Sequence, residues 1–262
     1  MIVGAGILTP AHLTQETIGK ISSADIVYTL VPDPLGLSTI KKLNSKIADL
    51  ADYYFDPKSE DNGKNRLEAY DVMVDVVLSS VRKNLKVVCV FYGHPGIFVY
   101  PAHKMIAEAR ADYFMATMLP AISAEDCLYS DLGIDPGYSG CVSFEASQYL
   151  FFNHPSNPYA TMILWQIGVV GDEYLNRLVP AEHGLEMLRE RLLQNYPPEH
   201  RVILYEASTL PIMQHRCEEI TISELPSAKV STITTLVIPP AKTLAINHEF
   251  CSQWKVAIDQ LT

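Results

Sequence analysis

The sequence predicts an α/β protein with two lobes. In the first half, short apolar runs such as "DIVYTLV" (25–31) and "KVVCVFY" (86–92) alternate with helix-like patterns, which is typical of a parallel sheet built from βαβ units. In the second half strand-like runs dominate, so we expect a more antiparallel sheet there. We place the boundary at "LPAIS", which gives an N-terminal lobe of residues 1–121 and a C-terminal lobe of residues 122–262.

The elements of the first lobe can be assigned in chain order from their apolar periodicity. The expected elements are a strand and glycine turn at 1–8, a helix at 12–25, a strand at 25–31, a helix at 62–83, a strand at 86–92, a helix at 102–113, and a fourth strand and loop at 114–123. The buried stripe that we expect on the long helix is Leu67, Tyr70, Val74, Val77 and Val81.

The second lobe begins with acidic residues after "AIS", which favour the first turn of a helix. Further strands are expected at 161–170, 201–208 and 229–238. The one strong helix among these strands, at 184–196, has Leu185, Leu188 and Leu192 along one face.

Composition excludes several functions. The 262 residues are 48% hydrophobic and 19% charged, so the chain can bury a core. A net charge of −10 argues against broad contact with nucleic acid. The five cysteines form no CxxC pair or zinc-like spacing, so no metal is expected. The sequence shows no signal peptide or membrane-length apolar run, and we expect a cytoplasmic protein.

Three loops follow predicted strands and contain glycine or other small residues. Gly4 and Gly6 come after the first strand, but the third glycine of a dinucleotide-binding loop is missing. "YGHPG" (92–96) and "AISAE" (121–125) follow two further predicted strands. Ligands of parallel sheets bind beyond the carboxyl ends of the strands. The loops are therefore either structural turns or the rim of a binding crevice.

Arg66 and Tyr70 are spaced i, i+4 near the start of the long helix, so they share a face. Asp61 or Asn62 can cap this helix. The pair is either a solvated arginine beside a half-buried tyrosine or a polar clamp that faces the crevice.

Longer strings of the sequence resemble a known family. "VGAGILTPAHLT", "YGHPGIF" and "LPAISAEDCL" look like the three loops of the tetrapyrrole methylase fold, and the match spans nearly the whole chain. "NGKNRLEAY", "SAEDCLYSDLGIDPG", "GCVSFEAS", "LWQIG" and "STITTLVIPPAK" are similar to the borosin peptide α-N-methyltransferases within that superfamily. The string "FDPKSED" (55–61) looks like a longer loop than those enzymes have.

The resemblance implies S-adenosylmethionine as cofactor, bound in a cleft between two α/β lobes, and methylation of backbone amides in a precursor peptide. It implies a catalytic cluster of Arg66, Tyr70 and Tyr92 and no metal. The cofactor-binding residues that it implies are Tyr92, His94, Ile97, Ser123, Ala124, Gln166, Ala207, Thr234 and Thr235.

The resemblance also implies a homodimer. Because the sequence stops soon after "IPPAK" without an appended peptide, we expect the split type of borosin enzyme, which acts on a separate precursor. Two alternatives stay open: a small-molecule methyltransferase of the corrin or porphyrin type, and a cofactor-binding regulatory module without chemistry.

Overall fold

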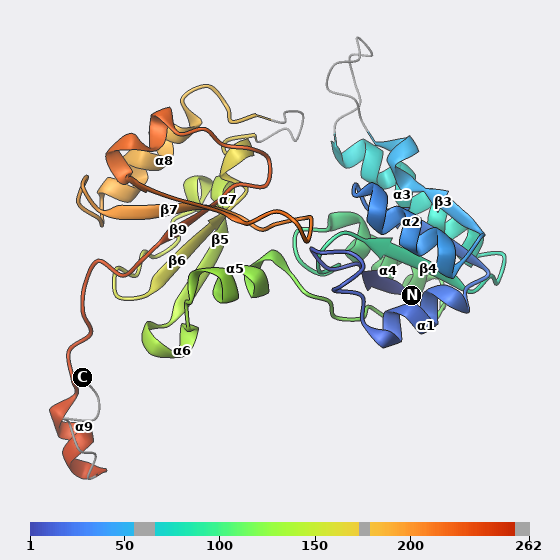
Figure 1. The fold of residues 1–262 in the computed structure, drawn as a ribbon, viewed down its shortest axis with the longest axis horizontal. Coiled ribbons are helices and arrows are strands. Elements are labelled where there is room, and N and C mark those ends of the chain that lie inside the picture. The colour runs from blue at the N-terminus through green and yellow to red at the C-terminus, as the bar shows by residue number, and fades with distance from the viewer. Residues whose placement is uncertain (55–65, 173–178, 255–262) are drawn as a thin grey trace. The chain divides into compact units, whose positions relative to one another are not determined.

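The computed structural model describes residues 1–54, 66–172 and 179–254, which form two separate sheets (Figure 1). Contacts divide the chain into two compact units. The first unit consists of Met1–Ile134, Asp172–Ala181 and Tyr205–Cys217, and the second of Asp135–Gly171, Glu182–Leu204 and Glu218–Thr262. The lobe boundary at residue 121 was inferred from sequence pattern alone and stays a prediction.

The first sheet is parallel, as the sequence predicted, and its strand order is β1-β4-β2-β3. All five residues of β4 are buried, because this inner strand is covered on both faces. The strands are β1 (Ile2–Gly4), β2 (Ile26–Leu30), β3 (Ile47–Asp49) and β4 (Val87–Phe91).

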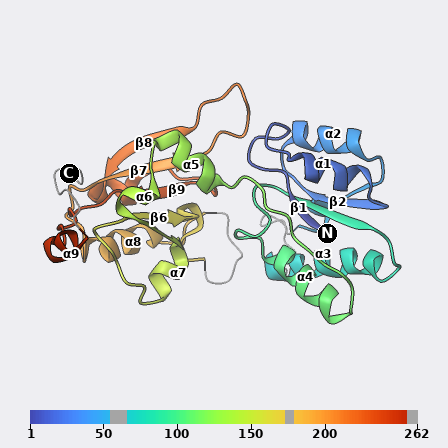
Figure 2. The ribbon, with the colours of Figure 1, turned by 90° about the horizontal axis from the view of Figure 1, so that it is seen from below.

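Four helices cover the two faces of this sheet (Figure 2). Side chains of α3 (Arg66–Val81) and α4 (Tyr100–Ala111) form one apolar core with one set of strand residues. Side chains of α1 (Gln15–Ser22) and α2 (Pro34–Leu43) pack in a second core with the alternate set. A 3₁₀ turn, η1 (Leu50–Tyr53), follows β3 and packs near α3.

The predicted buried stripe of α3 is wrong at its beginning. Val74 and Val77 are buried as expected, but Leu67 is 38% exposed. The buried face is centred on the row Ala69, Met73 and Val77, and Leu67 lies in the first turn at the margin of that row.

The predicted strand within 114–123 is also wrong. Among these residues only Met118 forms a bridge, an isolated parallel one with Ile2. Pro120, which has no backbone N–H to donate, ends the pairing after Leu119. The chain then enters α5 (Ala124–Leu132), the helix that the acidic residues predicted.

The second sheet has the order β5-β6-β9-β7-β8. β5 and β6 are parallel whereas β6 and β9 are antiparallel, so the sheet is mixed, and the expectation of more antiparallel pairing is confirmed. Its strands are β5 (Cys141–Glu145), β6 (Thr161–Trp165), β7 (Arg201–Glu206), β8 (Arg216–Thr221) and β9 (Thr235–Ile238).

The helix α8 (Gly184–Leu193) carries the predicted leucine stripe, and Leu185, Leu188 and Leu192 are all buried in the core of this sheet. The remaining helical elements are shorter than α8. They are α6 (Pro136–Ser139), α7 (Ala146–Phe151), η2 (Ile167–Val169), η3 (Ile222–Ser227) and α9 (His248–Gln253).

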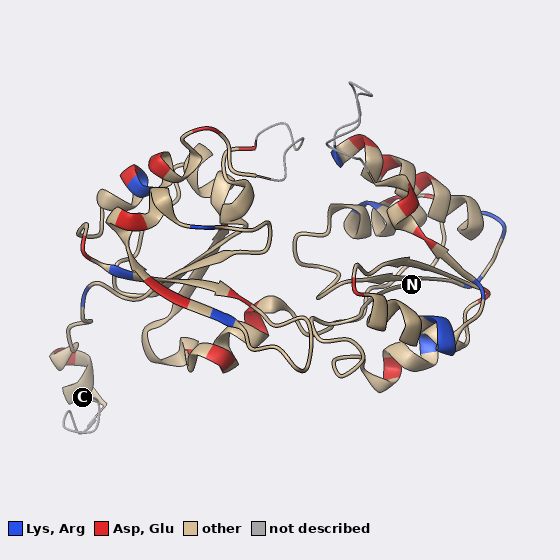
Figure 3. Ribbon diagram, turned by 45° about the horizontal axis from the view of Figure 1, so that its top comes forward, with Lys and Arg blue, Asp and Glu red and all other residues tan. Residues whose placement is uncertain are grey.

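Charge is spread over many elements. Figure 3 colours the ribbon at lysine and arginine positions, and among the described residues these positions are scattered over several helices and strands and form no continuous run. A continuous basic stripe is the usual footprint of nucleic-acid binding. Within the described ranges, no helix has the length and apolar character needed to cross a membrane.

Gly168 provides a test of the packing in the second unit. A Cβ built on Gly168, within η2, would lie 1.7 Å from the carbonyl oxygen of Ser231. Gly168→Ala should therefore destabilise the protein by about 1–3 kcal/mol or more. Urea unfolding followed by circular dichroism measures this change.

Gly19→Ala is the matched control, because a Cβ at Gly19 in α1 meets nothing within 4 Å. Alanine in a helix interior should stabilise this position by about 0.5–1 kcal/mol. Equal stability of the Gly168→Ala protein and its parent would contradict the packing described here.

Candidate functional site

The loop after β4, residues 92–99, is joined to the segment after β1 by backbone hydrogen bonds. The N–H of Gly6 donates to the carbonyl of Gly93 (3.3 Å), and the N–H of Gly93 donates to that of Gly6 (3.0 Å). A Cβ at Gly4 would lie 2.2 Å from the Gly93 oxygen and 2.5 Å from the Cβ of Ala121. Glycine at position 4 therefore allows three segments of the protein's own chain to meet at the carboxyl edge of the first sheet.

His94 is held in one orientation inside this loop. Its Nδ1 accepts the N–H of Gly96 at 3.0 Å, so the neutral ring carries its proton on Nε2. The N–H of Ile97 donates to the carbonyl of His94 at 3.2 Å, and the Ile97 side chain is 39% exposed. The loop thus carries the Nε2–H donor of His94 and the apolar side chain of Ile97, and both residues are predicted to contact the cofactor.

Ser123 and Ala124, also predicted to bind cofactor, lie at the beginning of α5. Ser123 is the N-cap, and its Oγ accepts the N–H of Asp126 at 3.2 Å. The Asp126 carboxylate accepts both the N–H and the hydroxyl of Ser123, each at 2.7 Å. This capping box engages the Ser123 hydroxyl within the helix terminus.

The other predicted cofactor residues lie elsewhere in the chain. Gln166 follows β6 in a left-handed conformation (φ 62°), and the N–H of Ile167 donates to the carbonyl of Thr234 at 3.2 Å. Thr234 and Thr235 are buried, and both belong with Gln166 to the second unit. Ala207 directly follows β7 and belongs to the first unit. The joining of these two groups into one cofactor site stays a prediction.

Two of the predicted catalytic residues, Tyr70 and Tyr92, line one cavity of about 500 Å³ in the first unit. A third tyrosine, Tyr54, lines it as well, and its hydroxyl lies 3.1 Å from that of Tyr70. We call this space the tyrosine cavity. The rest of its lining is apolar and consists of Leu30, Val31, Pro32, Ala51, Phe91, Phe98, Val99 and Pro101.

The hydroxyls of Tyr70 and Tyr92 remain protonated at neutral pH. Burial raises the pKa of Tyr92 to about 12, with smaller electrostatic contributions from Cys127 and Asp33. Burial also raises the pKa of Tyr70, and Tyr54 raises it further, whereas the positive charge of Arg66 opposes the shift. Both groups are therefore hydrogen-bond donors in this structure and not bases.

Arg66, the third predicted catalytic residue, begins α3 one helical turn before Tyr70. Its Nη2 donates to Oδ2 of Asp172 at 2.7 Å. Both side chains are largely buried, with 12% and 2% exposure. The helix thus brings Arg66 to the same face as Tyr70, and an ion pair holds its guanidinium.

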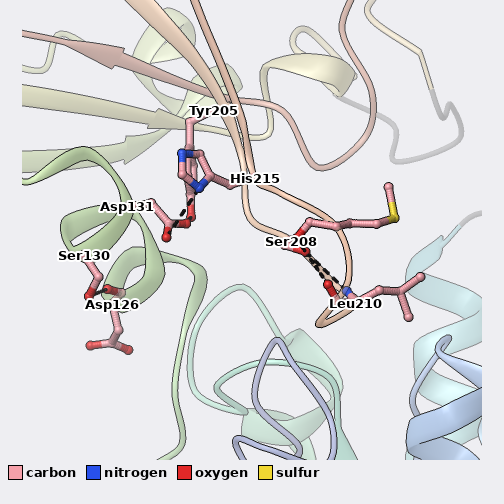
Figure 4. Close-up of polar contacts among 8 residues, drawn as sticks. Asp126, Ser130, Asp131, Tyr205, Ser208, Leu210 and His215 are labelled. Carbon is pink, nitrogen blue, oxygen red and sulfur yellow. Dashed lines mark hydrogen bonds and ion pairs between the residues drawn. The ribbon is translucent and has the colours of Figure 1, made fainter.

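A second cavity of about 510 Å³ lies within the first unit, between α5, the segment after β1 and the loop 207–215. Figure 4 shows the polar contacts of part of its wall. The hydroxyl of Tyr205 donates to Asp131 at 2.7 Å, and Nδ1 of His215 lies 3.5 Å from the same carboxylate. The described residues of its lining include the carboxylates of Asp126 and Asp131 and no lysine or arginine. We call this space the acidic cavity.

Sequence reasoning missed Tyr54 and Asp172. Tyr54 is the second of two adjacent tyrosines before the segment 55–65, and Asp172 lies 106 positions from its partner Arg66. Neither Tyr54 nor Asp172 stands at a helical or strand spacing from its partner that would predict the contact. The predicted helix caps Asp61 and Asn62 and the loop 55–61 lie outside the described residues. In the described part of the chain, no cluster of His, Cys, Asp or Glu could hold a metal ion.

The hydroxyl contact in the tyrosine cavity can be tested with Tyr54→Phe. Tyr54 raises the pKa of Tyr70 through its charge and its hydrogen bond, so the variant should lower that pKa. Because burial remains, the pKa should stay above the ordinary value of about 10. NMR titration of ¹³C-labelled tyrosine, with Tyr70→Phe used to assign the signal, measures the change.

The same shift predicts how stability depends on pH. A tyrosine whose pKa is raised by folding contributes stability that is present below the unfolded pKa of about 10 and is lost as the pH rises from that value through the raised folded pKa. The parent should therefore lose stability more steeply in this range than Tyr54→Phe. Tyr53→Phe, at a 40% exposed neighbour, is the control. The contact between the Tyr54 and Tyr70 hydroxyls would be contradicted if Tyr54→Phe left the pKa of Tyr70 unchanged, or if Tyr53→Phe lowered it equally.

Comparison with known proteins identifies close relatives in sequence. The chain is 40% identical over 258 residues to a methyltransferase/ribosomally synthesized cyclic peptide lentinulin A precursor of Lentinula edodes, which covers 97% of this chain and 60% of the relative. It is 38% identical over 265 residues to a methyltransferase/ribosomally synthesized type I borosin cyclic peptide precursor of Coprinopsis marcescibilis, covering 98% and 66%. The chain thus spans less than two thirds of the length of these curated relatives.

Solved structures share the fold at low sequence identity. Uroporphyrin-III C-methyltransferase of Thermus thermophilus matches with a TM-score of 0.62 at 16% identity, covering 95% of this chain and 97% of that chain. A structure of the enzyme complexed with S-adenosylhomocysteine matches with a TM-score of 0.60 at 16% identity, covering 91% and 95%. These matches, together with the two β-sheets and their helices, confirm the predicted α/β fold class.

The family model for Tetrapyrrole (Corrin/Porphyrin) Methylases matches residues 1–226, which include both sheets up to β8. This chain therefore belongs to the tetrapyrrole methylase family.

Proposed function

We propose that this protein is an S-adenosylmethionine-dependent methyltransferase that methylates backbone amide nitrogens of a ribosomally made peptide. The observation that carries the proposal is the tyrosine cavity, which Tyr54, Tyr70 and Tyr92 line, with Arg66 one helical turn before Tyr70. The relatives described as methyltransferases joined to cyclic-peptide precursors support a peptide as the substrate class.

The chemistry of an amide explains why such a cavity is needed. The nitrogen lone pair is delocalised into the carbonyl, so the nitrogen is a poor nucleophile. Methylation is easier from an imidate-like form that places negative charge on oxygen. A cation and hydroxyl donors aimed at that oxygen stabilise this form. Arg66 supplies a charge that persists at any working pH, and Tyr70 and Tyr92 supply the donors.

The raised tyrosine pKa values assign roles to these groups. Tyr70 and Tyr92 hold their protons at neutral pH, so they donate hydrogen bonds to the substrate instead of removing its amide proton. In the overall exchange an N–C bond to the methyl group forms, the bond between sulfur and methyl breaks, and the amide proton passes to solvent water. The apolar lining of the cavity excludes other water and strengthens these electrostatic interactions.

The residues present fit the proposed cofactor, which when bound supplies a methyl group activated on a sulfonium. Carboxylates and apolar side chains together line the acidic cavity, a combination suited to a cationic and amphipathic ligand. Ala121 and Ile122 of that lining adjoin Ser123 in sequence, and Ser208 adjoins Ala207. Asp126 and Asp131 would face positive charge there, and His94 Nε2 would donate to an acceptor. The S-adenosylhomocysteine bound to a protein of this fold supports the proposal.

The second candidate is a small-molecule methyltransferase, favoured by the likeness to uroporphyrin-III C-methyltransferase. Tetrapyrrole substrates carry several carboxylates, which bind best to lysine and arginine side chains. Among the described residues, those that line the two cavities include neither, and Arg66, one helical turn from the tyrosine cavity, is already paired with Asp172. A regulatory module without chemistry would not need a largely buried arginine, paired with an aspartate, one helical turn from a cavity tyrosine. Peptide methylation is therefore the function that the cavities favour.

The first test separates cofactor binding from chemistry. The protein should bind S-adenosylmethionine or S-adenosylhomocysteine in calorimetry and should not bind NADH. Arg66→Ala and Tyr70→Phe should each slow methyl transfer by about 10²–10³, the usual effect of removing an oxyanion donor, with cofactor affinity little changed. Tyr113→Phe, at a 97% exposed tyrosine, is the control and should transfer at the parental rate. Near-parental rates in both site variants would defeat their catalytic role.

The second test concerns the source of the peptide. The curated relatives carry the precursor in the same polypeptide, whereas we propose a separate precursor that docks on a homodimer of this protein. A separate precursor would need affinity for the enzyme in place of the high effective concentration of a linked peptide. Mass spectrometry of a co-expressed precursor should show increments of one methyl group, and tandem fragmentation should place them on backbone nitrogens.

Light scattering should give about twice 29.2 kDa. Methylation only of a peptide fused to this chain would reject the separate precursor but keep the chemistry. Methyl groups on a tetrapyrrole, with every peptide untouched, would favour the second candidate.

A further inference from the structure

The ion pair between Arg66 and Asp172 joins two residues that are 106 positions apart in the sequence. The Asp172 side chain is 2% exposed, and the Arg66 side chain is 12% exposed. Arginine and aspartate are rarely buried to this extent unless they are paired, because each charge loses its hydration. The contact of 2.7 Å compensates for part of that loss and holds the guanidinium in one position.

Neither Arg66 nor Asp172 is among the described residues that line the tyrosine cavity. Arg66 lies one helical turn before Tyr70, which does line it, and shares a helix face with that tyrosine. The ion pair with Arg66 gives Asp172 a route by which to act on a substrate in the cavity.

We infer that Asp172 is a positioning residue for Arg66 in the reaction. It holds the guanidinium beside the tyrosine cavity, so that the positive charge faces the place where the amide oxygen becomes negative. This inference rests on the proposed function, in which Arg66 stabilises that oxygen. A guanidinium carries several N–H donors in a rigid fork, so the bond from Nη2 to Asp172 is compatible with a second acceptor.

Positioning and simple structural pairing lead to different expectations. An ion pair that only stabilises the fold would change unfolding but not the turnover of the folded enzyme. A carboxylate that places the guanidinium should affect kcat, because oxyanion donors must be aligned with the charge that develops in the transition state. The KM for peptide should change little, because Asp172 does not line the cavity.

The test is a double-mutant cycle with Asp172→Asn, Arg66→Ala and the combined variant. Peptide methylation kinetics, calorimetric binding of S-adenosylmethionine and urea unfolding are measured for each. Asp172→Glu is included because it keeps the charge, so the protein should fold, while it moves the carboxylate by one methylene. Asp71→Asn is the matched control. Asp71 lies in α3, like Arg66, and forms a 2.7 Å ion pair with Lys104 of α4, but its side chain is 50% exposed.

We expect Asp172→Asn to lower kcat by about tenfold to a hundredfold, as loss of a supporting partner commonly does. Asp172→Glu should lower kcat in the same direction by a smaller factor, with unchanged KM and cofactor affinity. In the Arg66→Ala background neither change should lower kcat further, because the group through which Asp172 acts is gone. Asp71→Asn should keep the parental kcat.

Parental kcat in folded Asp172→Asn and Asp172→Glu would overturn the inference. If only Asp172→Glu folds, a parental kcat of that variant alone would overturn the inference. A further loss of kcat on changing Asp172 in the Arg66→Ala background would also overturn it, since Asp172 would then act independently. A parent protein that methylates no peptide would defeat the proposed function together with this inference, whereas a methylating parent with unaffected Asp172 variants defeats the inference alone.

Discussion

The reciprocal backbone contact between Gly6 and Gly93 is the constraint on which the candidate site depends. It joins the segments after β1 and β4 at the carboxyl edge of the parallel sheet, at 3.3 and 3.0 Å. The contact requires glycine at position 4, where a Cβ would collide with the Gly93 oxygen. Because the loop 92–99 is held at its beginning, Tyr92 and Phe98 can line the same cavity as Tyr70 from α3. The position of the tyrosine cavity is thus a consequence of backbone packing between two loops.

Burial in that cavity determines what its side chains can do. Removing tyrosine from water disfavours the phenolate, so Tyr70 and Tyr92 act as donors over the whole physiological pH range. The positive charge of Arg66 opposes this effect at Tyr70, and its pairing with buried Asp172 balances that charge. The first unit of this chain therefore combines three tyrosines around an apolar space with an ion-paired arginine one helical turn from Tyr70. This combination suits the stabilisation of negative charge on a neutral substrate better than the binding of an anionic one.

Much of the fold follows from local pattern. The strands at 25–31 and 86–92 and the helix with Leu185, Leu188 and Leu192 were predicted because alternate or helical spacing of apolar residues reports directly on burial. The prediction of a strand within 114–123 is wrong because Pro120 ends pairing after a single bridge. The prediction that Leu67 is a core residue is wrong, because the elements that pack against α3 determine which of its residues are buried. Sequence pattern did not reveal β3, β5 or β8. β3 has only three residues, and the residues of β5 and β8 are half-buried or exposed, so neither strand forms an apolar run.

The sequence by itself determined the residue types of the candidate site and their local order. The i, i+4 spacing of Arg66 and Tyr70 and the glycine loop that contains His94 are local properties, readable because helix geometry and turn chemistry depend on near neighbours. Only the tertiary structure decided that Tyr54 contacts Tyr70 and that Asp172 neutralises Arg66. Burial and electrostatic pairing act through space. Residues 16 and 106 positions apart therefore become partners only when the chain has folded.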